Sequence, residues 1–155
     1  MFNNFRVYLR ALEPDDYKTS IEWRKDDEIW SMLVGPKYFV SEAYEKKWVE
    51  DAIFNSKNKL TLAICLKESD EHIGYTYISN IDWKNRSAQS HSKIANGDFR
   101  GKGYGTMAST ALVKYAFEEL NLHCIYSHVI EYNEASKRVR EKIGFIREGI
   151  LRDRI

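Results

Sequence analysis

Short apolar or alternating runs mark the strands that this chain is expected to form. Such runs, rich in β-branched and aromatic residues, lie at Phe5–Leu12, Leu60–Lys67, Ile73–Ile81 and Cys124–Ile130. Ala88–Ala95 is unusually polar, and we assign it to a strand from its position between other elements rather than from its pattern.

Apolar residues at helical spacing predict the helices. These lie at about Pro14–Lys25, Glu42–Asn55, Thr106–Leu120 and Asn133–Ile143. The aromatic stretch from Asp26 to Val40 contains a Gly35-Pro36 breaker and is expected to be irregular. A last strand is expected to begin at Phe145. The order β-α-α-β-β-β-α-β-α-β predicts an α/β fold with helices on the faces of one mixed sheet.

Composition narrows the class of protein. The 155 residues suit one domain, spanning 1–155, and 24 Lys and Arg against 23 Asp and Glu give a net charge of +1. This balance gives no electrostatic footprint for nucleic acid. No apolar run is long enough for a membrane span, and the first residues lack a secretory signal, so we expect neither a membrane partner nor export. Cys65 and Cys124 lie in apolar runs, which predicts buried thiols in a reducing, cytoplasmic compartment without a metal site.

Three glycines fall within one five-residue window between a predicted strand and a predicted helix. They are Gly101, Gly103 and Gly105. Side-chain-free backbone at a helix start presents N–H groups to an anion, usually a phosphate. Arg100 and Lys102 are expected to add mobile positive charge. The window is neither a P-loop nor a dinucleotide fingerprint, in which a third glycine would replace Thr106.

The window Arg100–Gly105 resembles the pyrophosphate motif [RQ]-x-x-G-x-[GA] of the GNAT acetyltransferases. Further blocks resemble family motifs in the expected order: Val7–Leu12 with Asp15-Asp16, Ile73–Tyr75, Asn133–Ser136 with Glu141–Phe145, and Ile146–Gly149. The opening block is similar to the RimJ/RimL-like branch. Together these motifs extend over nearly the whole chain.

The resemblance implies a twisted, mostly antiparallel mixed sheet with helices on both faces and splayed fourth and fifth strands. Acetyl-CoA would lie in that gap. The implied cofactor contacts are the backbone of Ile94, Ala95 and Asn96 for pantetheine, Arg100, Gly101, Lys102, Gly103, Tyr104, Gly105 and Thr106 for pyrophosphate, and Asn133, Ser136 and Arg140 for the thioester end. No metal is implied.

The resemblance also implies direct attack of an amine on the thioester within a ternary complex. His91 is the best ionisable candidate for the base, because Gln89 and Ser90 occupy the positions where many members carry a glutamate. Asn133 and Ser136 are further catalytic candidates. Many members place a tyrosine where this chain has Arg140, which does not donate a proton at ordinary pH but can stabilise a thiolate or a phosphate.

We therefore expect an N-acetyltransferase acting on a primary amine, either a protein N-terminus or a small molecule. A polyamine such as spermidine is an alternative acceptor. The 11 acidic and 10 basic residues of positions 1–60 give no strong field that favours one acceptor. The competing class is a non-catalytic module that binds acyl-CoA or a nucleotide phosphate. The aromatic residues Trp23, Trp30, Tyr38 and Phe39 are expected to line the acceptor wall or the core.

Family members continue after the position of Gly149 with a final strand that closes the sheet, whereas this sequence stops at Ile155. We expect that strand to be absent from the chain, or a partner strand to complete the edge. Since an open edge strand favours association, a homodimer is one hypothesis.

Overall fold

The sheet forms the centre of the molecule. The computed structural model describes residues 4–31 and 38–152. The described strands follow the order β1-β2-β3-β4-β5 across the sheet, with bounds Val7–Ala11, Leu60–Leu66, His72–Asp82, Ser87–Ile94 and Cys124–Tyr126. Neighbouring strands are antiparallel except β4 and β5, which run parallel. The predicted mixed, mostly antiparallel sheet is confirmed, including the polar strand that we assigned from position.

Helices form in all four regions where the sequence predicts them, and α4 begins at Tyr104, two residues before the predicted Thr106. The described helices are η1 (Pro14–Asp16), α1 (Tyr17–Trp23), α2 (Asp27–Ser31), α3 (Glu42–Phe54), η2 (Gly97–Phe99), α4 (Tyr104–Glu118) and α5 (Glu134–Lys142). Ser41 caps α3 by accepting a hydrogen bond from the Tyr44 N–H, and Asn133 caps α5 in the same way. The short helix α2 lies in a stretch that we expected to be irregular.

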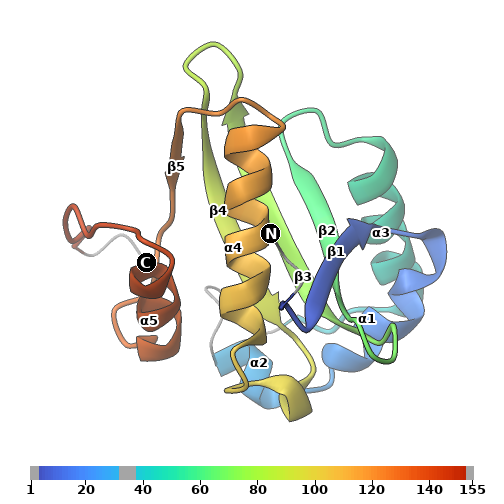
Figure 1. Cartoon of the computed structure of the whole chain (residues 1–155). Helices are drawn as coiled ribbons and strands as arrows, with labels where there is room; N and C mark the ends of the chain where they lie inside the picture. Colours follow the sequence, from blue (N-terminus) through green and yellow to red (C-terminus); the bar gives the residue numbers. More distant parts are fainter. Residues whose placement is uncertain (1–3, 32–37, 153–155) are drawn as a thin grey trace.

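Two hydrophobic layers hold helices against opposite faces of the sheet. On one face, Tyr104 and Ala108 of α4 pack with Ile64 and Ile73 (Figure 1). On the other, Trp23 of α1 packs with buried Tyr75, joined by the half-buried Trp48 of α3. The sheet therefore separates an α4 face from a face covered by α1 and α3, and this division positions the site described below.

Three sequence-based expectations at the C-terminal side are wrong. The strand predicted over Cys124–Ile130 ends at Tyr126. The strand expected at Phe145 does not form, and Ile146 is 86% exposed. A strand is stable only beside a hydrogen-bonding neighbour, and no described strand lies beyond the free edge of β5. Cys124, expected to be buried, is exposed because it begins a three-residue strand at this edge, whereas Cys65 is buried.

Candidate active site

The last two strands separate after a short pairing. Residues Ser87–Gln89 of β4 pair with β5, and the next contact is the Ser127 hydroxyl donating to the Ser90 carbonyl at 3.1 Å. From there β4 continues along β3 to Ile94, while the chain after β5 turns away toward α5 (Figure 1). The predicted splay between the fourth and fifth strands is confirmed, and it opens a cleft.

The main chain of β4 faces this cleft at alternate residues. The Ser90 carbonyl points toward β5, since it accepts the hydrogen bond from Ser127. Ser92, two residues further, turns its main-chain groups the same way, into the widening gap. An extended amide-containing ligand can therefore add to β4 here as a further strand would.

The positions expected to bind pantetheine lie just beyond. The N–H groups of Ala95 and Asn96 both donate to the Ile73 carbonyl, at 2.9 and 3.1 Å. Arg100 donates to the carbonyls of Ile94 and Ala95, at 3.2 and 2.9 Å. These hydrogen bonds hold the end of β4 in place. The main chain of β4 that is turned toward the gap lies nearer Ser92.

The glycine window forms the start of α4. Gly101 and Gly103 have φ values of 73° and 85°, in the left-handed region that favours glycine. Gly103 is the N-cap of α4, no side chain caps this end, and the first turn contains no acidic residue. The first N–H groups of a long helix are therefore available to an anion, which fits the pyrophosphate of acetyl-CoA.

Arg100 is fixed rather than mobile. Its guanidinium pairs with Glu28 at 2.6 Å and with Asp26 at 2.9 Å. These ion pairs tie the loop before α4 to α2, so Arg100 acts on the loop mainly as a brace.

Arg6 is a further cation near this loop, and the sequence did not predict its position. Arg6 donates to the Lys102 carbonyl at 2.9 Å, and its guanidinium lies 4.7 Å from the centroid of the Tyr104 ring. Nothing in the pattern around Arg6 indicates this role, because 96 residues separate it from Lys102.

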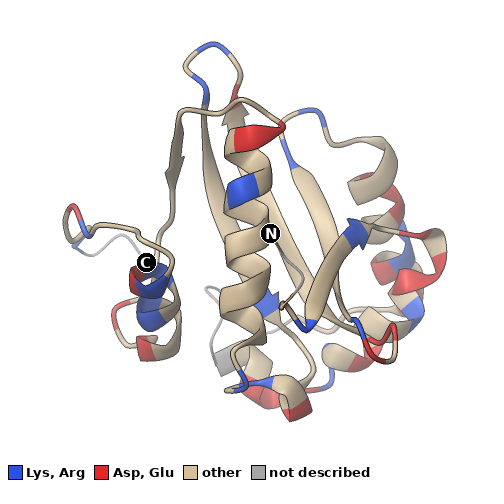
Figure 2. Ribbon diagram, viewed as in Figure 1, with Lys and Arg blue, Asp and Glu red and all other residues tan. Residues whose placement is uncertain are grey.

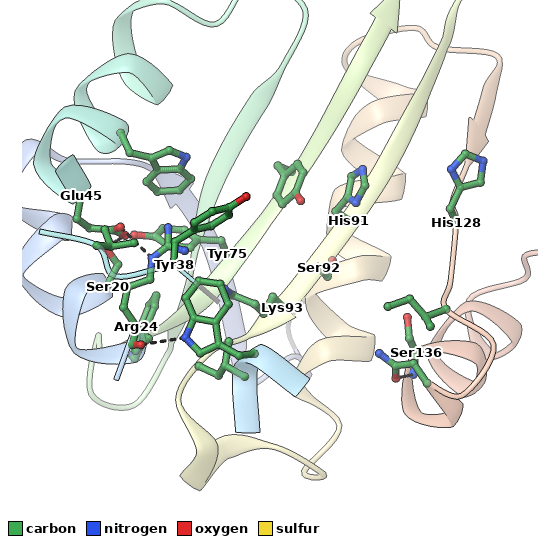
Figure 3. Close-up of a pocket in the computed structure, with 18 of the residues that line it drawn as sticks. Ser20, Arg24, Tyr38, Glu45, Tyr75, His91, Ser92, Lys93, His128 and Ser136 are labelled. Carbon is green, nitrogen blue, oxygen red and sulfur yellow. Dashed lines mark hydrogen bonds and ion pairs between the residues drawn. The ribbon is translucent and has the colours of Figure 1, made fainter. Parts of the chain in front are cut away.

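A cavity of about 830 Å³ lies over the splay, between α1, α2 and α3 on one side and α5 on the other (Figure 3). It is lined by four of the predicted site residues: His91, Asn133, Ser136 and Arg140. The expected aromatic wall also lines it: Trp23, Trp30, Tyr38 and Phe39. The structure thus brings the catalytic candidates and the aromatic stretch to one cavity, whose volume suits a small-molecule site.

His91 lies on the cavity floor, stacked against Tyr77 with 4.4 Å between ring centroids and 12° between planes. Its Nε2 shares a hydrogen bond with the Ser79 hydroxyl at 3.2 Å. Burial, together with the positive charges of Arg140 and Lys59, lowers the pKa of His91 to about 4. The imidazole is therefore neutral at pH 7 and able to accept a proton.

Arg140 lies where α5 approaches the splay. It is 9% exposed and makes two long hydrogen bonds to Ser90, of 3.4 Å to the hydroxyl and 3.5 Å to the carbonyl, while its Nε has no partner among the described residues. Burial lowers the pKa of Arg140 to about 10, so it stays charged at pH 7. Figure 2 shows further Lys and Arg on α5.

Asn133 and Ser136 belong to the same helix start. The Asn133 side chain accepts the Ser136 N–H at 3.0 Å, so it is occupied in capping α5, whereas the Ser136 side chain faces the cavity (Figure 3). This capping hydrogen bond fixes the first turn of α5 at the edge of the cavity.

An ion-paired cluster that the sequence did not reveal lies on the α1–α3 side. Glu45 is 1% exposed and accepts hydrogen bonds from the Ser20 hydroxyl at 2.6 Å and from Arg24 at 2.9 Å. The Tyr75 hydroxyl beside it is buried without a partner among the described residues. Burial raises the pKa of Tyr75, which therefore stays protonated.

Over the described ranges, no helix combines the length and apolar character required to cross a membrane. The same residues contain no group of three or more His, Cys, Asp or Glu side chains arranged to hold a metal ion.

Comparison with known proteins gives concordant matches. Residues 6–146 match the family model described as acetyltransferase (GNAT) domain. The chain is 29% identical to a Bacillus licheniformis protein named uncharacterized N-acetyltransferase p20, over 96% of this chain and 83% of that one. It is 28% identical to the spermidine N(1)-acetyltransferase of Vibrio cholerae, with the same coverage.

A solved structure is similar across the fold. The spermidine N-acetyltransferase of Vibrio cholerae in complex with CoA and spermine superposes with a TM-score of 0.82 at 26% identity, over 93% of this chain and 83% of that one.

Proposed function

The chain belongs to the GNAT acetyltransferases and is an acetyl-CoA-dependent enzyme, and we propose that it acetylates a primary amine by direct attack in a ternary complex. The splay between β4 and β5 is the observation that carries this proposal. The splay leads from the start of α4 to the cavity over His91. The start of α4 lacks a side-chain cap and is therefore suited to bind the pyrophosphate. A thioester at the end of pantetheine laid along β4 would reach that cavity.

The transfer needs a proton acceptor and a charge that stabilises sulfur. The ammonium form of the amine first loses a proton to solvent. The neutral nitrogen then bonds to the thioester carbonyl carbon and the C–S bond breaks, which yields an N-acetyl amine and the thiol of CoA. His91, neutral at pH 7, takes the proton that the nitrogen sheds once its new bond has formed. Arg140 stabilises the departing thiolate, which then takes a proton from solvent.

We assign the pyrophosphate to the N–H groups of Gly101–Thr106, with Lys102 and Arg6 as nearby cations. Pantetheine lies along Ser92, and the first turn of α5 with Asn133 and Ser136 faces its thioester end. In this assignment Arg100 braces the loop without contacting phosphate.

The acceptor is a protein N-terminus or a small-molecule amine, as in the RimJ/RimL-like branch. Spermidine is the alternative, since one relative and one structural neighbour are named for that activity. A homodimer completed through the free edge of β5 stays a prediction, which light scattering after size exclusion tests.

Thiol release from acetyl-CoA in the presence of a panel of amines tests the proposal, with mass spectrometry of the product. We expect amine-dependent release and one acetyl group on the amine nitrogen. Tight CoA binding with no release above the amine-free rate for any amine would instead favour the non-catalytic module.

A further inference from the structure

Two adjacent residues of β4 face opposite sides of the sheet. The Ser92 hydroxyl accepts a hydrogen bond from Ser109 of α4 at 2.9 Å, so Ser92 points to the α4 face. Lys93 pairs across the sheet with Tyr75, on the face covered by α1 and α3, and lines the cavity there (Figure 3). Its charge therefore lies on the side of the sheet opposite to α4, whose start suits pyrophosphate.

Other cations accompany Lys93 on this face. The Lys59 ammonium lies 4.4 Å from the centroid of the Tyr77 ring, and Tyr77 is the next residue of β3 on the same face as Tyr75. Arg24 also lines the cavity. The part of the cavity beside α1 and α3 thus presents Lys93 and Lys59, together with Arg24, which pairs with Glu45. The pyrophosphate assignment uses none of these three side chains.

The cavity offers no unpaired carboxylate among the described residues that line it. Glu45 is the one acidic residue among the described residues that line the cavity. Its two oxygens are taken by Ser20 at 2.6 Å and Arg24 at 2.9 Å. No carboxylate therefore remains in the described lining to hold an additional ammonium group of a polyamine.

Lys93 has no carboxylate within ion-pairing distance among the described residues. Burial, and then the charge of Arg24, lower the pKa of Lys93 to about 8, against the opposite effect of Glu45. An anionic partner stabilises the charged form of a partly desolvated ammonium, because its attraction replaces the hydration that the ammonium has lost.

We infer that the acceptor amine carries an anionic group, in the simplest case a carboxylate, and that Lys93 is its counter-ion. The inference rests on the proposed function and narrows its substrate class. Lys59 adds a second positive charge that attracts this anionic group. Trp30 and Tyr38 of the cavity wall contact the apolar body of the acceptor. The anion has two sources, a free amino acid or an acidic residue near a protein N-terminus.

Matched pairs of amines test this inference. One pair is phenylalanine and phenethylamine, and the other is a short peptide amide with either aspartate or asparagine at its second residue; spermidine is a fifth substrate. We expect kcat/KM at least about tenfold higher for the anionic member of one pair, which also identifies the source of the anion. Lys93→Gln should abolish that preference through KM, whereas Lys84→Gln, in the exposed turn before β4, should retain it.

Binding measured without turnover separates this inference from the proposed function. The tryptophans of the cavity report, by fluorescence, the binding of N-acetylphenylalanine, of N-acetylphenethylamine and of the two N-acetylated peptides to the CoA-loaded protein. A preference for an anionic ligand that Lys93→Gln removes supports the inference even when no amine is acetylated. Efficient acetylation of spermidine, or of both members of each pair equally, would support the proposed function and overturn the inference.

Discussion

The imidazole of His91 lies flat against the phenol ring of Tyr77, 4.4 Å from it, on the floor of the cavity. The stack and the hydrogen bond between His91 Nε2 and the Ser79 hydroxyl fix the ring in the strand. Because the ring is buried and lies near the positive charges of Arg140 and Lys59, its pKa is lowered and it stays neutral at pH 7. A fixed neutral imidazole beside the splayed strands is able to accept the amine proton, although its lowered pKa makes it a weak base that passes the proton on to solvent.

His91→Gln should lower kcat by about tenfold, less than the ~100-fold or more that a general base with a pKa near the operating pH contributes, and leave the affinity for CoA unchanged. Glutamine retains a partner for Ser79 but does not accept the proton. Thiol release under saturating acetyl-CoA measures the effect. The matched control is His123→Gln, at an exposed position before β5, which should behave as wild type. Wild-type kcat in His91→Gln would remove His91 from the reaction.

Gly103→Asp should weaken CoA binding by tenfold or more, because it adds a carboxylate at the helix end assigned to the pyrophosphate. The left-handed backbone at Gly103 also disfavours a side chain, and Gly103→Asn separates the two effects, since asparagine tolerates this conformation without a charge. Calorimetry should therefore rank wild type, Asn and Asp in order of decreasing affinity.

The control for that charge is Gly149→Asp, where a side chain meets open space and the backbone is ordinary. Its CoA affinity should equal that of wild type. Equal affinities for Gly103→Asp and Gly149→Asp would refute the placement of the pyrophosphate.

Arg140→Met should separate activity from stability. The guanidinium is buried with no carboxylate partner among the described residues and only long hydrogen bonds, so its removal should change the free energy of unfolding in urea by no more than ~1 kcal/mol, or raise it. Since the thiolate then lacks its cation, kcat should fall by at least about tenfold. Arg138→Met, exposed on the same helix, should leave both quantities unchanged. A large loss of stability in Arg140→Met would show a structural role instead.

Binding of N-acetylphenylalanine should weaken as the pH rises through about 8, the lowered pKa of Lys93. The sign follows because Lys93 attracts a carboxylate only while protonated, below that pH. The ligand has no amine to titrate, and Arg140, whose pKa is lowered to about 10, loses charge only at the upper end of the range. Titrations between pH 6 and about 10 measure the effect, and Lys93→Gln should bind weakly and independently of pH; a parallel decline in that variant would assign the titration to another group.

The sequence alone predicted the parts of the site that depend on local chain chemistry. Glycines before a helix start, the Asn133 cap and the apolar spacing of α4 each involve neighbouring residues, so their pattern is visible in the sequence. The short helix α2 was missed because its five residues contain too little periodicity to recognise.

The positions of the charged residues in the cavity, where the acceptor is proposed to bind, depend instead on strand register and helix packing. Whether Lys93 faces the cavity is decided by its pairing with Tyr75, and a polar strand does not reveal its own register. Likewise, Glu45 meets Ser20 and Arg24 only because α3 packs against α1. Contacts between distant segments of this kind leave no motif.

A crystal structure of the protein with CoA and N-acetylphenylalanine tests the central claim most directly. The account predicts pantetheine in the gap between β4 and β5 beside Ser92, the pyrophosphate at the N–H groups of Gly101–Thr106, and the sulfur within the cavity near His91 and Arg140. CoA bound outside this gap, or a sulfur remote from the cavity, would contradict it.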